Sequence, residues 1–177
     1  MVRPIILILG AIPILAAIFI VVPTLFRPEI PSSEVNQEDV LTLQYTKEHL
    51  EKVSFGVTQS VGADTAEVLT IQRDGTAIYS LTKNGYSKPD IKYQLSGEEF
   101  KELKSLIKET GFVDIPDEVY QTKPDATSYE KYGLQVTLNG KTVNLQWAGQ
   151  NASQEFIPPI ITQVQSSLDG IIAEIMR

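Results

Sequence analysis

Residues 132–147 read YGLQVTLNGKTVNLQW, and their pattern decides the fold class of the chain. Asn139-Gly140 separates two runs of β-favouring residues and predicts a hairpin, because a type I′ turn needs positive φ at both central residues. Polar and apolar side chains alternate along both runs, so one face of the predicted sheet is buried and the other contacts water. The apolar face carries Leu134, Val136, Leu138, Val143, Leu145 and Trp147, and the polar face carries Gln135, Thr137, Thr142, Asn144 and Gln146.

Two further glycine turns lie upstream of this hairpin. Asp74-Gly75 and Asn84-Gly85 each separate β-favouring runs. These runs cover residues 66–72, 76–82 and 86–95, and another strand is expected over 53–60. A short helix is expected around residues 46–51. Together the runs predict an antiparallel sheet of about five to six hairpin-connected strands.

Two amphipathic helices are expected to cover the apolar face of this sheet. The first begins at Ser96, where Glu99 completes a capping box, and ends at Gly111. The second begins near Pro158 or Pro159, because proline is favoured in the first turn of a helix. Their apolar stripes are Phe100, Leu103, Leu106 and Ile107, and Ile160, Ile161, Val164, Leu168, Ile171, Ile172 and Ile175. The predicted fold class is α+β, with two helices on one face of the sheet.

A long apolar run precedes this domain. Residues 4–26 contain no charge, and as a helix they would span roughly 35 Å, enough for a hydrocarbon core of about 30 Å. We expect a transmembrane anchor over residues 1–27, a linker over 28–40 and the α+β domain over 41–177. A cleaved signal peptide and a buried helix of a soluble protein are the alternatives. The run is long for a signal peptide and has no small-residue cleavage site at its end.

Flanking charges set the expected orientation of the anchor. Arg3 and the α-amine precede the apolar run, whereas Arg27 alone follows it before several acidic residues. The excess of positive charge favours a cytoplasmic N-terminus and an extracytoplasmic C-terminal domain. The expected location is therefore the cell membrane, with a single pass. Asn151 begins a sequence that accepts N-linked glycans, which suits this side of the membrane.

Small residues and a proline interrupt the predicted anchor. Pro13 removes a helical hydrogen bond, which membrane helices tolerate when a neighbour or water satisfies the carbonyl. The simple interpretation is a kink without function. The alternative is a packing surface against another membrane helix, formed by Gly10, Pro13, Ala16 and Ala17. Other membrane proteins are the partners that this interpretation predicts.

Charge and cysteine content exclude several classes of function. The chain has a formal net charge of −7, and the part beyond the anchor, without Arg3 and Arg27, has 13 basic and 22 acidic residues, a net of −9. This balance argues against nucleic-acid binding, which needs clustered basic residues. The chain has no cysteine, so neither a disulfide nor a thioether-linked lipid is available to it.

The residues that carry chemistry are sparse. His49 is the single histidine, which is too little for a zinc site or a serine triad with a recognisable nucleophile motif, and we interpret it as exposed or at an edge. No glycine-rich phosphate loop is present, so no cofactor and no metal are expected. The acidic segment with Asp114, Asp117 and Asp125 has three interpretations: helix capping by Asp114 or Asp117, a calcium site, or acid–base catalysis.

Four aromatic residues surround the last hairpin and the loop before it. They are Tyr120, Tyr129, Tyr132 and Trp147. Tyrosine and tryptophan are enriched in protein interfaces, so this group is a candidate partner-binding face. The alternative is that these side chains pack in the core and at its rim.

The stretch Leu95–Phe100 (LSGEEF) and the pattern that follows it resemble small emfourin-like domains. The matching positions continue through Leu103, Leu106, Ile107, Phe112, Ile115, Pro116, Asp125, Tyr129, Tyr132, the Asn139-Gly140 hairpin and the closing isoleucine-rich helix. The resemblance covers roughly residues 66–175. Emfourins inhibit thermolysin-like metalloproteases, so the resemblance implies an inhibitory function. The chain differs by its anchor and an additional N-terminal strand, and no inhibitory loop can be placed in it.

These observations predict a non-enzymatic, single-pass membrane protein whose extracytoplasmic domain binds another protein, as an accessory subunit of a membrane complex. A membrane-tethered protease inhibitor is the first alternative. A calcium-dependent or hydrolytic enzyme that uses the acidic segment is the second.

Overall fold

The computed structural model describes residues 38–55 and 58–177, with side chains for all of these except 53–55 and 58–60. The described residues belong to one compact unit, Ser32–Arg177. The predicted anchor, with Gly10, Pro13, Ala16 and Ala17, lies outside the described residues. Among the residues that are described, no helix is both long and apolar enough to cross a membrane.

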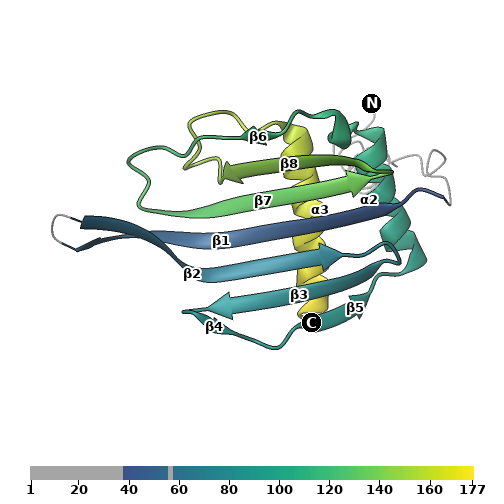
Figure 1. Cartoon of the computed structure of the whole chain (residues 1–177), viewed down its shortest axis with the longest axis horizontal. Coiled ribbons are helices and arrows are strands. Elements are labelled where there is room, and N and C mark those ends of the chain that lie inside the picture. Colours follow the sequence, from purple (N-terminus) through teal and green to yellow (C-terminus); the bar gives the residue numbers. More distant parts are fainter. Residues whose placement is uncertain (1–37, 56–57) are drawn as a thin grey trace, which may run out of the picture. The chain divides into compact units, whose positions relative to one another are not determined.

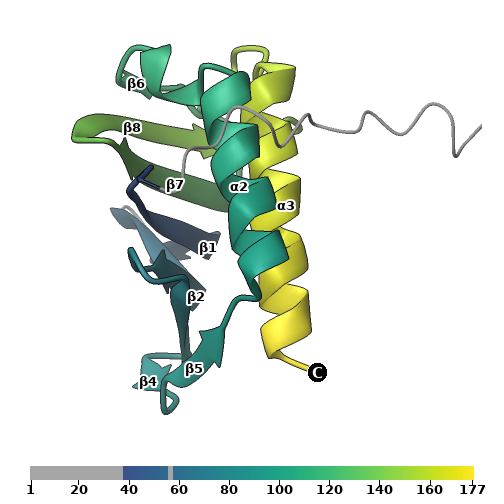
Figure 2. The same ribbon diagram turned by 90° about the vertical axis from the view of Figure 1, so that its right-hand side faces the viewer.

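Within this part of the chain, one eight-stranded sheet packs against two α-helices. The elements are β1 (Leu41–Phe55), β2 (Thr58–Ile71), β3 (Thr76–Lys83), β4 (Tyr86–Ser87), β5 (Ile91–Gln94), α2 (Gly97–Glu109), the 3₁₀-helix η2 (Phe112–Asp114), β6 (Glu118–Val119), β7 (Ser128–Leu138), β8 (Lys141–Ala148) and α3 (Pro159–Ile175). Both α-helices lie on the same side of the sheet (Figure 2). The α+β fold and the placement of the helices confirm the sequence prediction.

The sheet has the strand order β4-β3-β2-β1-β7-β8-β6, and β5 pairs with β3 (Figure 1). All pairs are antiparallel except β6 with β8. The described strands outnumber the five to six that we predicted because β4, β5 and β6 have only two to four residues. Such short segments hydrogen-bond to an edge without a hydrophobic alternation that a sequence pattern could show.

The predicted glycine turns are confirmed. Asn139 and Gly140 have φ of 52° and 85°, and Asn84 and Gly85 have φ of 51° and 78°, as type I′ turns require. The turn before β3 is wider. Only Gly75 has a positive φ there, and its N–H donates to the carbonyl of Gln72.

The predicted helix over residues 46–51 is wrong, because these residues are the middle of strand β1. The predicted strand over 53–60 is divided between the end of β1 and the start of β2. Leu41, Leu43 and Tyr45 are buried while the residues between them are not, so β1 continues the alternation of a half-buried strand. β2 and β7 hydrogen-bond to its two sides, and this tertiary pairing outweighs the local preference of the segment.

Both helices begin as predicted. The Glu99 N–H donates to Ser96 Oγ over 3.2 Å, and the Ser96 N–H donates to Glu99 Oε2 over 2.7 Å, which completes the capping box of α2. Gly111 follows α2 with φ of 64°, and Pro159 opens α3. Their buried apolar residues are Leu103, Leu106, Ile107, Ile161, Val164, Leu168, Ile171 and Ile172. The core therefore lies between one face of the sheet and these two helices.

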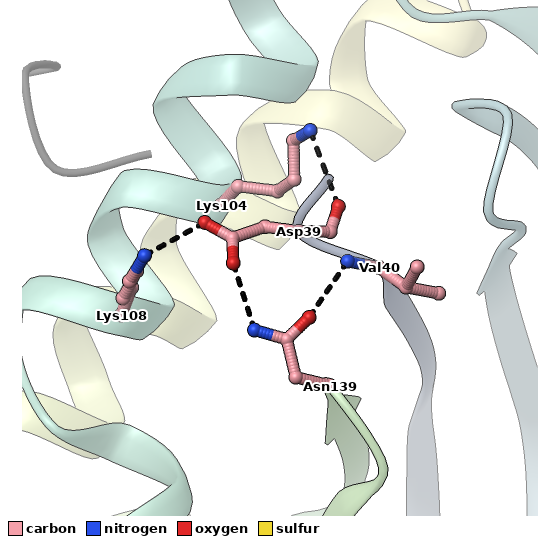
Figure 3. Close-up of polar contacts among 5 residues, drawn as sticks. All are labelled: Asp39, Val40, Lys104, Lys108 and Asn139. Atoms are coloured by element: carbon pink, nitrogen blue, oxygen red, sulfur yellow. Dashed lines mark hydrogen bonds and ion pairs between the residues drawn. The ribbon is translucent and has the colours of Figure 1, made fainter. Parts of the chain in front are cut away.

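A polar junction fixes the start of β1 to α2 and to the β7–β8 turn (Figure 3). The Asp39 carboxylate, only 6% exposed, pairs with Lys108 Nζ at 2.8 Å and accepts a hydrogen bond from Asn139 Nδ2 at 2.7 Å. Asn139 Oδ1 accepts from the Val40 N–H at 2.9 Å, and Lys104 Nζ donates to the Asp39 carbonyl at 3.5 Å. The last residues of the predicted linker are thus held firmly against the domain.

Candidate functional site

Two of the predicted interface aromatics belong to a buried stack. Tyr132 lies between Tyr45 and Trp147, with ring centroids 6.3 Å and 5.5 Å apart. Trp147 is 2% exposed, and its Nε1–H donates to Gln165 Oε1 of α3 over 3.1 Å. Tyr45 donates to Asp169 Oδ1 of the same helix over 3.0 Å. The stack therefore packs under α3, as the core alternative described, although Tyr132 and Trp147 also line a hollow of about 230 Å³ beside that helix.

The other two aromatics have different surroundings. Tyr120 is buried, and burial together with a hydrogen bond to Glu118 raises the pKa of its hydroxyl to about 12. Tyr129 is half-buried on β7. The four side chains do not share an exposed surface, because three of them are inside the domain. A partner-binding role for this group stays a prediction that rests on Tyr129.

The acidic segment does not cap a helix, so that expectation was wrong. Asp114 ends η2 and forms an exposed ion pair with Lys141. Asp117 Oδ1 accepts the backbone N–H of Asn144 at 2.6 Å, which attaches the segment to β8. Asp125 lies exposed in the following loop. Among residues 38–55 and 58–177, no three His, Cys, Asp or Glu side chains are grouped so that they could hold a metal ion.

His49 lies inside the sheet rather than at an edge. It is on β1, between β2 and β7, and its side chain is one-third exposed. Its Nδ1 lies 2.9 Å from Glu130 Oε1, and its Nε2 lies 3.3 Å from Ser128 Oγ. In serine hydrolases, a serine hydroxyl contacts the histidine Nε2 and a carboxylate contacts its Nδ1. Ser128, His49 and Glu130 make their contacts in the same order. No local sequence pattern indicates this grouping, because the partners are about 80 residues from His49.

Other contacts favour a structural role for His49. Glu51 Oε1 lies 3.8 Å from the same Nε2 that faces Ser128, so a second carboxylate competes for this nitrogen. The hydrogen bond to Glu130, with the charges of Glu130, Asp64 and Glu51, raises the pKa of His49. These carboxylates favour the protonated imidazole, and that form cannot accept a proton from a hydroxyl. We therefore interpret the group as a polar bridge between β1 and β7.

The sheet face opposite the helices is uncovered in the described part of the chain, and it carries a groove. A hollow of about 600 Å³ is lined by Thr42 and Gln44 of β1, Thr70 of β2, and Gln135 of β7, among others. A second hollow of about 240 Å³ shares Gln44 and Gln135 with it, and a third of about 200 Å³ continues from the second at Thr46. The shared residues make the three hollows one continuous groove along β1 and β7.

The middle of this open face, over β1, β7 and β8, carries no charged side chain. The face is formed by Thr42, Gln44, Thr46, Val68, Thr70, Thr76, Ile78, Ser80, Gly133, Gln135, Thr137, Thr142, Asn144 and Gln146, which alternate with buried residues in paired strands. Within the groove, charges lie at its two ends, as Arg73 with Asp74 and as Glu48 with Lys131. At the β3–β5 side of the face, Lys92 pairs with Ile78, and Ser80 Oγ donates to Asp90 Oδ1 over 2.7 Å. The domain over residues 41–177 has 18 acidic and 13 basic side chains, a net of −5, and the middle of the open face is an uncharged surface with many hydrogen-bonding groups.

The sequence predicted half of this surface. The polar face of the 132–147 hairpin is the β7–β8 part of the open face. The β1 part was missed because Thr46 belongs to the segment interpreted as a helix, residues 46–51, and Thr42 and Gln44 come just before it. Their alternation with Leu41, Leu43 and Tyr45 was the signal that could have shown it.

No protein-family model matches the chain, and the curated proteins include no match to it. The resemblance of residues 66–175 to emfourin-like domains therefore stays a hypothesis from sequence pattern. The geometry of the open face is the basis on which function can be argued.

Proposed function

We propose that this chain is a non-enzymatic, single-pass membrane protein whose extracytoplasmic α+β domain binds another protein through the open face of its sheet. The proposal makes it an accessory subunit of a membrane complex. The apolar run over residues 4–26 supports the anchor. The observation that carries the binding function is the uncharged middle of the sheet face opposite the helices.

Physical reasons favour a protein partner for this face. A sheet with one uncovered side normally carries charged and polar side chains in mixture, whereas this one excludes charge from its centre. Charged residues are depleted in the centre of protein interfaces, because desolvating an unpaired charge is costly. Threonine, glutamine and asparagine lose less on desolvation, since a partner can supply both donors and acceptors to them.

The test is to purify the tagged full chain from its native membrane in mild detergent and to identify the proteins that bind it stoichiometrically. Gln135→Arg places a charge in the open face, and Gln163→Arg places the same charge on the exposed side of α3. We expect Gln135→Arg to remove the partner and Gln163→Arg to retain it. Equal recovery with both variants would place the binding surface elsewhere.

A membrane-tethered protease inhibitor is the second candidate, and the resemblance to emfourin-like domains motivates it. The full chain would then inhibit a thermolysin-like protease at a stoichiometry near one to one. Unchanged activity across several such proteases would count against it.

The arrangement of Ser128, His49 and Glu130 makes the enzymatic alternative testable as well. A fluorophosphonate probe labels activated serines and would label Ser128 if the hydroxyl were a nucleophile. We expect the unmodified chain not to be labelled at Ser128. Labelling of the unmodified chain that Ser128→Ala abolishes would support the enzymatic alternative.

A further inference from the structure

The groove has the dimensions of an extended chain. Its floor follows β1 from Thr42 to Glu48, six residue steps, which at about 3.3 Å per residue is roughly 20 Å. A polypeptide in extended conformation with about six residues has the same length. The groove runs parallel to the strands, so an occupant of this shape would lie along β1 and β7.

Gly133 and the Thr46 side chain above it form the middle of the groove floor. It lies on β7 between β1 and β8, where a glycine weakens a strand and often marks a close approach of another chain. Thr46 of β1 inclines toward it, and its hydroxyl donates to the Gly133 carbonyl at 3.3 Å. A Cβ at position 133 would lie 2.5 Å from Thr46 Oγ1, so any larger residue would both displace Thr46 and raise the floor.

Amide side chains line the groove around Gly133 and Thr46. Gln44, Gln135, Asn144 and Gln146 are all exposed and contribute to the second hollow. Each carries a donor and an acceptor, the same two groups that every peptide unit presents. An extended backbone can therefore exchange hydrogen bonds with them without any charged group.

From these observations we infer that the groove binds an extended, uncharged segment of about six residues in the partner protein, with the partner's backbone hydrogen-bonded by the four amide side chains. The inference rests on the proposed function and names the part of the partner that the open face recognises. The charge pattern supports it. A charge at the centre of the segment would be buried against Gln44 and Gln135, where the second hollow offers no counter-charge, because the charged residues of the groove lie at its ends.

The test is a selection of random phage-displayed octapeptides on the immobilised full chain. We expect enriched peptides to be depleted in Lys, Arg, Asp and Glu, and their synthetic forms to bind. Placing one lysine or glutamate at the centre of a selected peptide should weaken its affinity for the chain by at least tenfold. Enrichment of charged peptides, or of none, would overturn the inference.

Variants of the groove floor separate blockage from misfolding. Thr46→Ala removes the side chain that a larger residue at 133 would meet, and the double variant Thr46→Ala/Gly133→Val then fills the groove without that clash. We expect the affinity of Thr46→Ala for the selected peptides to be within about threefold of that of the unmodified chain. The affinity of the double variant should be at least tenfold lower. Retained binding by a double variant that unfolds at the same urea concentration as Thr46→Ala would overturn the inference.

Two other occupants give different results. Maltohexaose and cellohexaose, titrated into the full chain, would bind if the groove took a neutral glycan. Concentration-dependent dimerisation that Gln135→Arg abolishes would show a second copy of the chain on the face. Either result without peptide binding would overturn this inference. The proposed function would fail separately, through equal partner recovery with Gln135→Arg and Gln163→Arg.

Discussion

Replacing Asp39 by alanine should destabilise the domain by about 3 kcal/mol. The Asp39 carboxylate is 6% exposed and contacts Lys108 Nζ and Asn139 Nδ2 at 2.8 and 2.7 Å. Removing one partner of a buried ion pair costs about 3–5 kcal/mol, because the remaining charge loses its counter-ion while it stays desolvated. Lys108 is 27% exposed and recovers part of its hydration, which lowers the expected cost to about 2–4 kcal/mol.

Urea unfolding of the full chain, followed by fluorescence, measures this loss. Trp147 is the single tryptophan of the chain and is buried under α3, so its emission reports the unfolding of the core. With an m-value of about 2 kcal/mol/M, a loss of 3 kcal/mol lowers the midpoint by about 1.5 M. A double-mutant cycle with Lys108→Met should show a coupling of at least about 1 kcal/mol.

The ion pair between Asp114 and Lys141 is the matched control, because it has the same chemistry but is 71% and 57% exposed. Asp114→Ala should cost less than about 1 kcal/mol. If Asp39→Ala lowered the free energy of unfolding no more than Asp114→Ala does, burial would not explain the stability of the junction, and the reasoning would be refuted.

Three other predictions concern the described domain. The hydrogen bond that His49 donates to Glu130 raises the pKa of His49 above its ordinary value near 6.5. The stabilising contribution of this bond is therefore complete below about pH 6.5 and is lost as pH rises through the raised pKa. The free energy of unfolding, obtained from urea titrations, should therefore fall by less than about 1 kcal/mol on going to alkaline pH. His49→Gln should remove this part of the pH dependence and leave the part due to other groups. Tyr45→Phe should cost about 1–2 kcal/mol in urea unfolding, since it leaves Asp169 without its 3.0 Å donor; an unchanged midpoint would mean that water replaces the hydroxyl. Gly140→Ala should cost about 1 kcal/mol because φ of 85° is unfavourable for alanine, and a neutral result would contradict the type I′ geometry of that turn.

Local features of the fold were predictable from the sequence. The Asn139-Gly140 turn, the Ser96 capping box and the apolar stripe of α3 each depend on residues within a few positions of one another. Their physical causes are positive φ, orphan amides at a helix end and a 3.6-residue period, and all three are visible in a short window. The α+β class follows from these elements.

The aromatic residues show what a sequence pattern leaves undecided. The pattern placed Trp147 on the apolar side of the last hairpin, and that was right, yet the same residue was also a candidate for a partner-binding face. A sequence tells which side of a strand is apolar but not what covers it. Only the packing of α3 over Tyr132 and Trp147 placed both side chains in the core.

The sequence by itself determined the turns at Asn84-Gly85 and Asn139-Gly140, the helix ends and the polar side of β7 and β8. The tertiary structure decided that β1 lies between β2 and β7, which brings His49 to Glu130 and Asp39 to Asn139 across 81 and 100 positions. It also joined Thr42, Gln44 and Thr46 to Gly133 and Gln135 in one groove. The physical reason is that hydrogen bonding along a strand edge is the same for every sequence, so the choice of neighbour depends on how all the apolar faces are buried together.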